Sequence, residues 1–111
     1  MSDREIMDSK FMSLKTNKTN NNNNMKYIKF EASWCGACKM LTPILRKVSE
    51  AGIPVESIDA EHNAELVTHY NVRNLPTVIL VNSGGYQLAR FTGTKEKAED
   101  YIITYQKHAN G

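Results

Sequence analysis

The segment Thr77–Val81, which reads TVILV, constrains the fold more than any other part of this chain. Successive side chains of a strand point to opposite faces of a sheet, so an apolar run of this kind requires cover on both faces. Ser83, Gly84 and Gly85 follow it as turn residues, and residues 86–92 (YQLARFT) then return. The sequence therefore predicts an antiparallel hairpin that starts from a strand at the centre of a sheet.

Strand and helix patterns alternate along the chain from Met25. We expect strands at residues 27–32 (YIKFEA) and 55–60 (VESIDA), and helices at residues 35–49, 63–70 and 94–108. The side chains expected to face inward from the second and third helices are Leu66, Val67, Tyr70, Tyr101, Ile102 and Tyr105. The order β-α-β-α-β-β-α predicts an α/β domain in which helices flank a central mixed sheet.

Residues 17–24 read NKTNNNNN and offer no apolar side chain to bury, so this tract cannot offset the entropy cost of ordering itself. We interpret it as a linker that ends an N-terminal extension, residues 1–24, and we place the folded domain at residues 25–111. Within the extension, a short docked helix and a frayed tail both fit the pattern. The residues that would share one helical face are Met7, Lys10, Phe11 and Leu14. No strand is expected ahead of Met25.

The length, charge and apolar content of the chain argue against several classes of function. The chain has 111 residues, enough for one domain, and its 14 basic and 12 acidic residues give a net charge of +2. This balance does not favour nucleic acid or a membrane surface as a partner, and no apolar run approaches the roughly 20 residues that span a bilayer. The charged N-terminus lacks the apolar stretch of a secretory signal, so we expect a cytoplasmic location. In a reducing compartment, a lone cysteine pair is typical of catalysis or metal binding rather than of a permanent disulfide.

The two cysteines of the chain, Cys35 and Cys38, lie where a strand gives way to a helix. Unpaired N–H groups and the positive end of the helix dipole favour a thiolate at Cys35, which can then act as a nucleophile. Cys38 lies one turn further on, within reach to close a disulfide. Gly36 allows a tight turn, Trp34 offers a flat apolar rim, and Lys39 adds positive charge nearby.

The stretch WCGACK resembles the active site of the thioredoxin family, and the resemblance extends over residues 25–109. The other matching positions are Pro43 in the helix, Asp59 at the end of the second strand, the sequence NLPT at residues 74–77, the turn at Gly84 and Gly85, and Gly93. A Cys-x-x-Cys pair alone is a weak signal. Together with the preceding tryptophan and the later Leu-Pro-Thr, it becomes a specific one.

The resemblance implies a dithiol–disulfide oxidoreductase that acts on protein disulfides without a cofactor. Cys35 would attack a client disulfide and Cys38 would resolve the mixed disulfide. A cis bond before Pro76 would place a tight turn beside the sulfur atoms, and the backbone of Leu75 would pair with an extended client. Trp34, Gly36, Ala37 and Gly93 would border the same groove. The implied partners are disulfide-containing client proteins and a dithiol electron donor, of the thioredoxin-reductase type or another.

Two positions depart from the family pattern. Lys29 stands six residues before Cys35, where thioredoxins usually carry a buried acid. Three hypotheses stay open for it: its charge stabilises a thiolate, it pairs with Glu31 on the same strand face, or its amine reaches water. Ala37 stands where thioredoxins have proline, and its presence suggests a more oxidising cysteine pair.

Other functions remain as alternatives at this stage. A zinc site would have to combine the cysteines with His62, His69 or His108, and nothing in the sequence places these near Cys35, so no metal is expected. A thioredoxin-fold adaptor would bind clients and turn over poorly. A glutathione-coupled oxidoreductase usually carries a different pair of residues between its cysteines.

Overall fold

The computed structural model describes residues 24–110. All but the last residue of the predicted N-terminal extension lies outside these residues, and the domain boundary at Met25 therefore stays a prediction. None of the described helices is long and apolar enough to cross a membrane.

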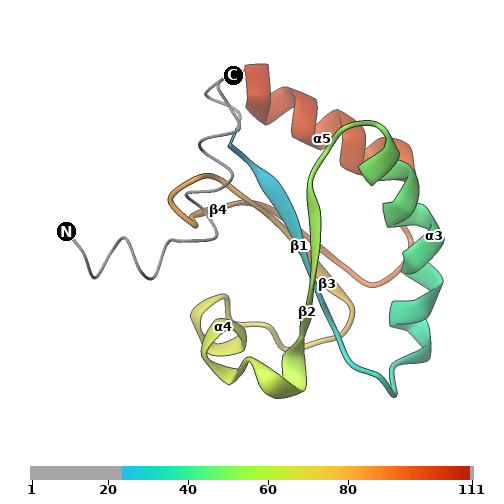
Figure 1. Cartoon of the computed structure of the whole chain (residues 1–111), viewed down its shortest axis with the longest axis vertical. Coiled ribbons are helices and arrows are strands. Elements are labelled where there is room, and N and C mark those ends of the chain that lie inside the picture. The colour runs from blue at the N-terminus through green and yellow to red at the C-terminus, as the bar shows by residue number, and fades with distance from the viewer. Residues whose placement is uncertain (1–23, 111) are drawn as a thin grey trace.

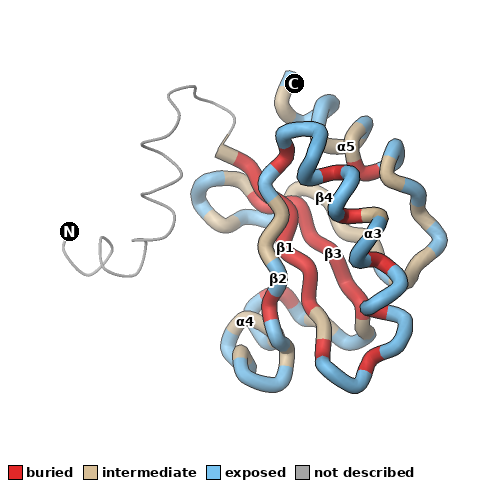
Figure 2. The backbone as a smooth tube through the Cα atoms, turned by 45° about the vertical axis from the view of Figure 1, so that its right-hand side comes forward, coloured by how far each residue is buried: buried red, intermediate tan, exposed pale blue. Residues whose placement is uncertain are grey.

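The centre of the molecule is a four-stranded sheet in the order β2-β1-β3-β4. The strands are β1 (Lys26–Glu31), β2 (Val55–Asp59), β3 (Thr77–Val81) and β4 (Gln87–Thr92). The pair β1 and β2 is parallel, whereas β1 with β3 and β3 with β4 are antiparallel, so the predicted mixed sheet is confirmed. All five residues of β3 are buried, and Figure 2 shows that burial is concentrated in the two inner strands. The apolar run TVILV is therefore covered on both faces, as expected.

Helices cover the two faces of the sheet. The helices α3 (Gly36–Glu50) and α5 (Ala98–Asn110) lie on one face, and η2 (Ala60–His62) and α4 (Ala64–His69) lie on the other (Figure 1). Alternate residues of β1 supply both cores, because neighbouring side chains of a strand point in opposite directions. Tyr27 packs with Leu41, Leu45 and Tyr101 beneath α3 and α5. On the opposite face, a second cluster joins Ile28, Phe30, Ile58, Tyr70, Ile79 and Val81, with Leu66 and Val67 packed against it.

The predicted order of strands and α-helices is confirmed, but most boundaries differ by a residue or more. The strand expected to end at Ala60 ends at Asp59, because the Asp59 carboxylate accepts a hydrogen bond from the Glu61 N–H at 2.9 Å and turns the chain into η2. The last helix begins at Ala98 rather than at residue 94. There the Asp100 carboxylate accepts from the Lys97 N–H at 2.8 Å and caps the new helix start. The strand expected to end at Ala32 ends at Glu31.

A cluster of tyrosines ties β1 to α5. The Tyr27 hydroxyl donates to the backbone carbonyl of Tyr101 at 2.5 Å, and the two rings meet edge to face with centroids 5.5 Å apart. Burial, followed by the charges of Glu96 and Asp100, raises the pKa of Tyr101 to about 12. Within residues 24–110, the buried Tyr101 hydroxyl has no hydrogen-bond partner. The two hydroxyls are thus similar in burial but differ in whether they are bonded.

This difference predicts opposite outcomes for two matched substitutions. Tyr27→Phe removes a bonded hydroxyl and should lower the free energy of unfolding by about 1 kcal/mol. Tyr101→Phe removes an unbonded one and should leave that free energy unchanged or raise it, because a buried polar group without a partner is costly. Urea unfolding of the three proteins would measure both changes. Equal losses of unfolding free energy in the two variants would contradict the conclusion that only the Tyr27 hydroxyl is hydrogen-bonded.

Candidate active site

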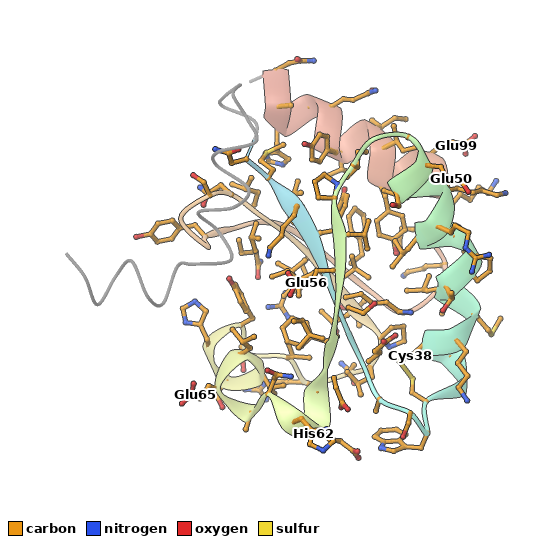
Figure 3. The ribbon with its side chains drawn as sticks, viewed as in Figure 1. Cys38, Glu50, Glu56, His62, Glu65 and Glu99 are labelled. Atoms are coloured by element: carbon orange, nitrogen blue, oxygen red, sulfur yellow. A yellow bond between two sulfur atoms is a disulfide. The ribbon has the colours of Figure 1, made fainter. Side chains whose placement is uncertain are left out.

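Cys35 and Cys38 are joined by a disulfide at the N-terminus of α3. Cys35 is the N-cap residue of this helix, and its Sγ accepts a hydrogen bond from the Cys38 N–H at 3.1 Å. Cys35 is 6% exposed and Cys38 is 1% exposed. The backbone donor and the helix dipole both favour negative charge on Cys35, the outer of the two sulfur atoms. Cys38 lies on the inner side of α3, at the same end of the molecule as His62 (Figure 3).

The loop before β3 lies beside the disulfide. The Leu75–Pro76 peptide bond is cis, as the family resemblance implies, and Leu75 packs against the cluster formed by Ala32, Cys35 and Cys38. Gly93, at a φ of 92°, donates from its N–H to the Pro76 carbonyl at 3.0 Å. A Cβ added at Gly93 would meet no atom within 4 Å, so the side of this residue is open. The structure thus brings together segments from three parts of the chain.

The remaining predicted site residues form an exposed surface around the cysteines. Trp34 is 66% exposed, and its Nε1 donates to the Glu61 carboxylate. Gly36, Ala37 and Lys39 are exposed on the first turn of α3, where a Cβ at Gly36 would meet nothing within 4 Å. The sequence analysis missed Met40, which is 64% exposed. Its spacing of four residues from Gly36 could have placed it on the same outer side of the helix.

A small polar network supports Trp34 from the loop after β2. His62 Nδ1 lies 2.7 Å from Asp59 Oδ2, and both side chains are exposed. The hydrogen bond with His62, followed by that from the Glu61 N–H, lowers the pKa of Asp59, and the same contact raises the pKa of His62. His62 belongs to η2, His69 to α4 and His108 to α5, so the three histidines lie on three different helices. Among the described residues, no cluster of His, Cys, Asp or Glu could hold a metal ion.

Lys29 is buried beneath α3, with 3% of its side chain exposed. Its Nζ lies 2.9 Å from Glu31 Oε1 and 3.4 Å from Thr42 Oγ1. The pairing with Glu31 was one of the three hypotheses for this residue, whereas an amine that reaches water does not fit the burial. Thr42 was missed by the sequence analysis, although it follows Cys38 by one helical turn.

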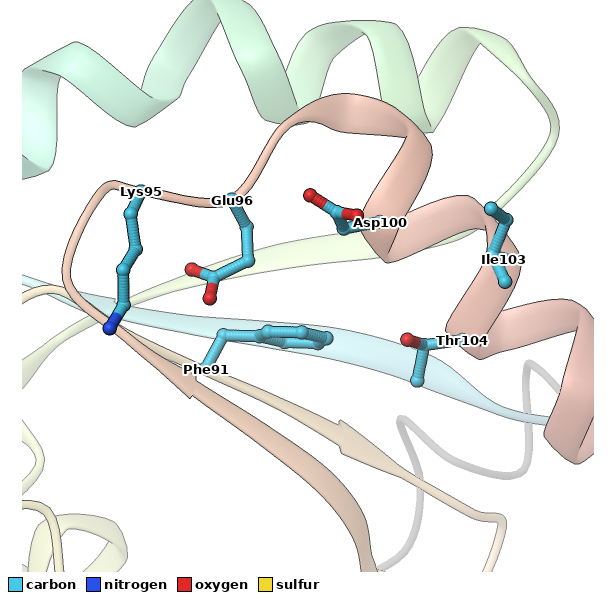
Figure 4. Close-up of a pocket in the computed structure, with 6 residues that line it drawn as sticks. All are labelled: Phe91, Lys95, Glu96, Asp100, Ile103 and Thr104. Atoms are coloured by element: carbon cyan, nitrogen blue, oxygen red, sulfur yellow. The ribbon is translucent and has the colours of Figure 1, made fainter.

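A separate hollow of about 380 Å³ lies between β4 and α5 (Figure 4). Its lining consists of Phe91, Lys95, Glu96, Asp100, Ile103 and Thr104. None of the residues grouped around the cysteines takes part in it. The candidate active site is therefore an exposed rim around the disulfide rather than this hollow.

Comparisons with known proteins point to one family. The family model for thioredoxin matches residues 8–105. Thioredoxin of Chlamydia pneumoniae is 38% identical over 85 residues, which cover 74% of this chain and 80% of that protein. Protein disulfide isomerase-like 1-1 of Arabidopsis thaliana is 34% identical over 101 residues, and these span 84% of this chain but only 20% of the plant protein. An N21Q mutant thioredoxin from Halobacterium salinarum has a similar structure, with a TM-score of 0.70, 28% identity, and coverage of 78% of this chain and 76% of that one.

The Asp59–His62 contact predicts a specific titration. The pKa of His62 should lie above its ordinary value of 6.5, and Asp59→Asn should bring the pKa back toward that value. Because the pKa of His62 is raised in the folded state, the stabilisation from this contact is complete below the ordinary value and is lost as pH rises through the raised one. Titration of the His62 imidazole signals by NMR in the wild type and in Asp59→Asn would measure this. A His62 titration that is the same in both proteins would contradict the contact.

Proposed function

The chain belongs to the thioredoxin family, and we propose that it is a dithiol–disulfide oxidoreductase that acts on disulfides of client proteins. The observation that carries this proposal is the geometry of the cysteine pair. The two sulfur atoms close a disulfide at a helix N-terminus, the second is more deeply buried than the first, and a cis-proline loop packs beside them. This arrangement assigns a different role to each cysteine.

In the proposed reaction, the Cys35 thiolate attacks one sulfur of the client disulfide. A bond forms between Cys35 and the client, and the client's second sulfur leaves as a thiolate. The Cys38 thiolate then attacks Cys35 Sγ, the Cys35–client bond breaks, and the client leaves with both cysteines reduced. The client thus gains two electrons from the dithiol of the protein, which is oxidised to the Cys35–Cys38 disulfide.

The exposed surface supports a role in client binding. Trp34 and Met40 offer apolar area next to Gly36 and Ala37, which leave the approach to Cys35 open. An extended client segment could pair with the backbone of Leu75, since this residue packs against the cluster that contains both cysteines. Gly93 would border the segment from the other side.

After each turnover, a dithiol donor must reduce the Cys35–Cys38 disulfide again. The proposed donor is an enzyme of the thioredoxin-reductase type. Such a donor keeps the pair reduced in a compartment like the cytoplasm, and we include a cytoplasmic location in the proposal. The direction of electron flow depends on the reduction potential of the pair. On the scale of known proteins, about −270 mV is typical of a reductase and about −180 mV of an isomerase.

Substitution of each cysteine tests the two roles. Cys35→Ser should abolish reduction of insulin disulfides, because the attacking sulfur is gone. Cys38→Ser should stop turnover as well but leave a mixed disulfide between Cys35 and the client, which mass spectrometry would detect. Equal trapping by the two variants would contradict the assigned order. A client-binding adaptor would show little turnover and little effect of Cys38→Ser, and a glutathione-coupled enzyme would respond to glutathione in the same assay.

Ala37 provides a test of the reduction potential. Its N–H belongs to the first turn of α3, where backbone donors have no partner within the helix and can stabilise a thiolate. Ala37→Pro removes this donor, so the reduced form should become less favourable and the potential should fall by tens of millivolts. Ala37→Ser keeps the N–H and serves as the control. Equilibration with a glutathione buffer measures both, and an unchanged or higher potential in the proline variant would refute the argument.

A further inference from the structure

The resolving step raises a question about a proton. A thiol attacks a disulfide only as the thiolate, so Cys38 must lose its proton before it can release the client. Its side chain is almost completely buried, and bulk water has little direct access to it. A neighbouring side chain that can accept the proton and pass it to solvent would solve this problem.

The register between β1 and α3 identifies such a neighbour. β1 runs toward the cysteines and α3 runs away from them. Lys29 lies beside Thr42 at one level, and Ala32 shares a packed cluster with Cys38 at another. Two residues of strand advance about 6.6 Å. Four residues of helix advance about 6 Å. Glu31, two residues after Lys29, therefore lies level with Cys38, which is four residues before Thr42.

The side of the sheet is also the required one. Tyr27, Lys29 and Glu31 alternate along β1, and Tyr27 packs under α3, so all three point toward this helix. The ion pair with Lys29 then holds the Glu31 carboxylate on that face. The Glu31 side chain is 34% exposed and Lys29 only 3%. Glu31 is thus the solvent-exposed member of an ion pair on the side of the sheet that faces α3.

A groove connects Glu31 with the outside. It has a volume of about 380 Å³ and lies between α3 and the strands β1 and β2, with Glu31, Lys29, Thr42 and Ser57 among its lining residues. A water molecule occupies about 30 Å³ of liquid, so the groove has ample room for solvent. Its polar lining offers hydrogen-bond partners to such waters.

Charges of both signs surround Glu31. On α3, Arg46 lines the same groove and Lys39 follows Cys38 on the exposed side. On β2, Asp59 is the register partner of Glu31, and beyond it lie Glu61 and His62. Positive and negative charges are thus both present around Glu31. Such a balance favours neither the carboxylate nor the carboxylic acid strongly, as a group that accepts and then returns a proton requires.

We propose that Glu31 accepts the proton of Cys38 in the resolving step and releases it to solvent through the groove, with Lys29 as the positioning residue that holds the carboxylate. This inference rests on the proposed function. The Cys38 S–H bond breaks and the Glu31 carboxylate becomes a carboxylic acid. The Cys38 thiolate attacks Cys35 Sγ, the Cys35–client bond breaks, and the client thiolate leaves and takes a proton from solvent. Glu31 then returns its proton to water.

An aromatic disulfide whose thiol product is coloured separates the two chemical steps. Mixed rapidly with one equivalent of the reduced protein, it releases a first coloured thiol when Cys35 attacks and a second when Cys38 resolves. Glu31→Gln has the same shape but cannot accept the proton. It should leave the first phase unchanged and slow the second at least tenfold at neutral pH. The difference should shrink as pH rises, because the Cys38 thiol then ionises without help.

The controls separate proton transfer from structural damage. Glu56→Gln changes a second glutamate that is paired with a buried lysine, Lys26, on the same two strands, and it should leave both phases unchanged. Glu31→Gln leaves Lys29 buried without its carboxylate, so the double variant Lys29→Met with Glu31→Gln removes the whole pair and avoids a stranded charge. This double variant should show the same slow, pH-dependent second phase.

Two outcomes would overturn the inference. A second phase that coincides with that of the wild type across pH would show that Glu31 takes no proton. A second phase that is slower by the same factor at every pH would indicate a structural effect alone. Failure of the proposed function would look different, because the first phase would then persist in Cys35→Ser.

Discussion

The burial of β1 and β3 on both faces is the constraint on which the rest of the structure depends. A strand that is covered on both sides must alternate its side chains between two cores, and β1 does so with Tyr27 in one and Phe30 in the other. The helices can then pack only above and below these strands. The chain turns from β1 directly into α3, which fixes the cysteine pair at the edge of this packed centre. The cysteine pair is thus fixed to the packed centre of the fold, while the residues around it stay exposed.

The features that the sequence could predict are those with a local cause. The run TVILV, the turn at Gly84 and Gly85, and the helical spacing of Tyr101, Ile102 and Tyr105 each depend on neighbours a few residues away, and the structure agrees with them. The position of the cysteines at a helix start is of the same kind. The late start of α5 could not be read from apolar spacing, because a single capping carboxylate, Asp100, decides it.

The polar contacts of the site escaped the sequence analysis for a different reason. The bond from Trp34 to Glu61 and the contact of Lys29 with Thr42 join residues on separate elements, and their partners depend on how strands and helices align in space. Only the Lys29–Glu31 ion pair could be predicted from the sequence, since both residues lie on one face of the same strand. The groove beside that pair depends on the sizes of side chains from three elements, which no spacing rule encodes.

The order of the site along the chain has a consequence for a newly made protein. Cys35 and Cys38 are three residues apart, so their sulfur atoms can meet as soon as one helical turn has formed. Leu75 and Gly93, which border the same sulfurs, are synthesised 40 and 58 residues after Cys35. A chain emerging from the ribosome therefore carries the reactive pair before it carries the walls that select a client. The cysteine pair can therefore react before the residues that select a client are present. The two parts of the site come together only when the sheet is complete.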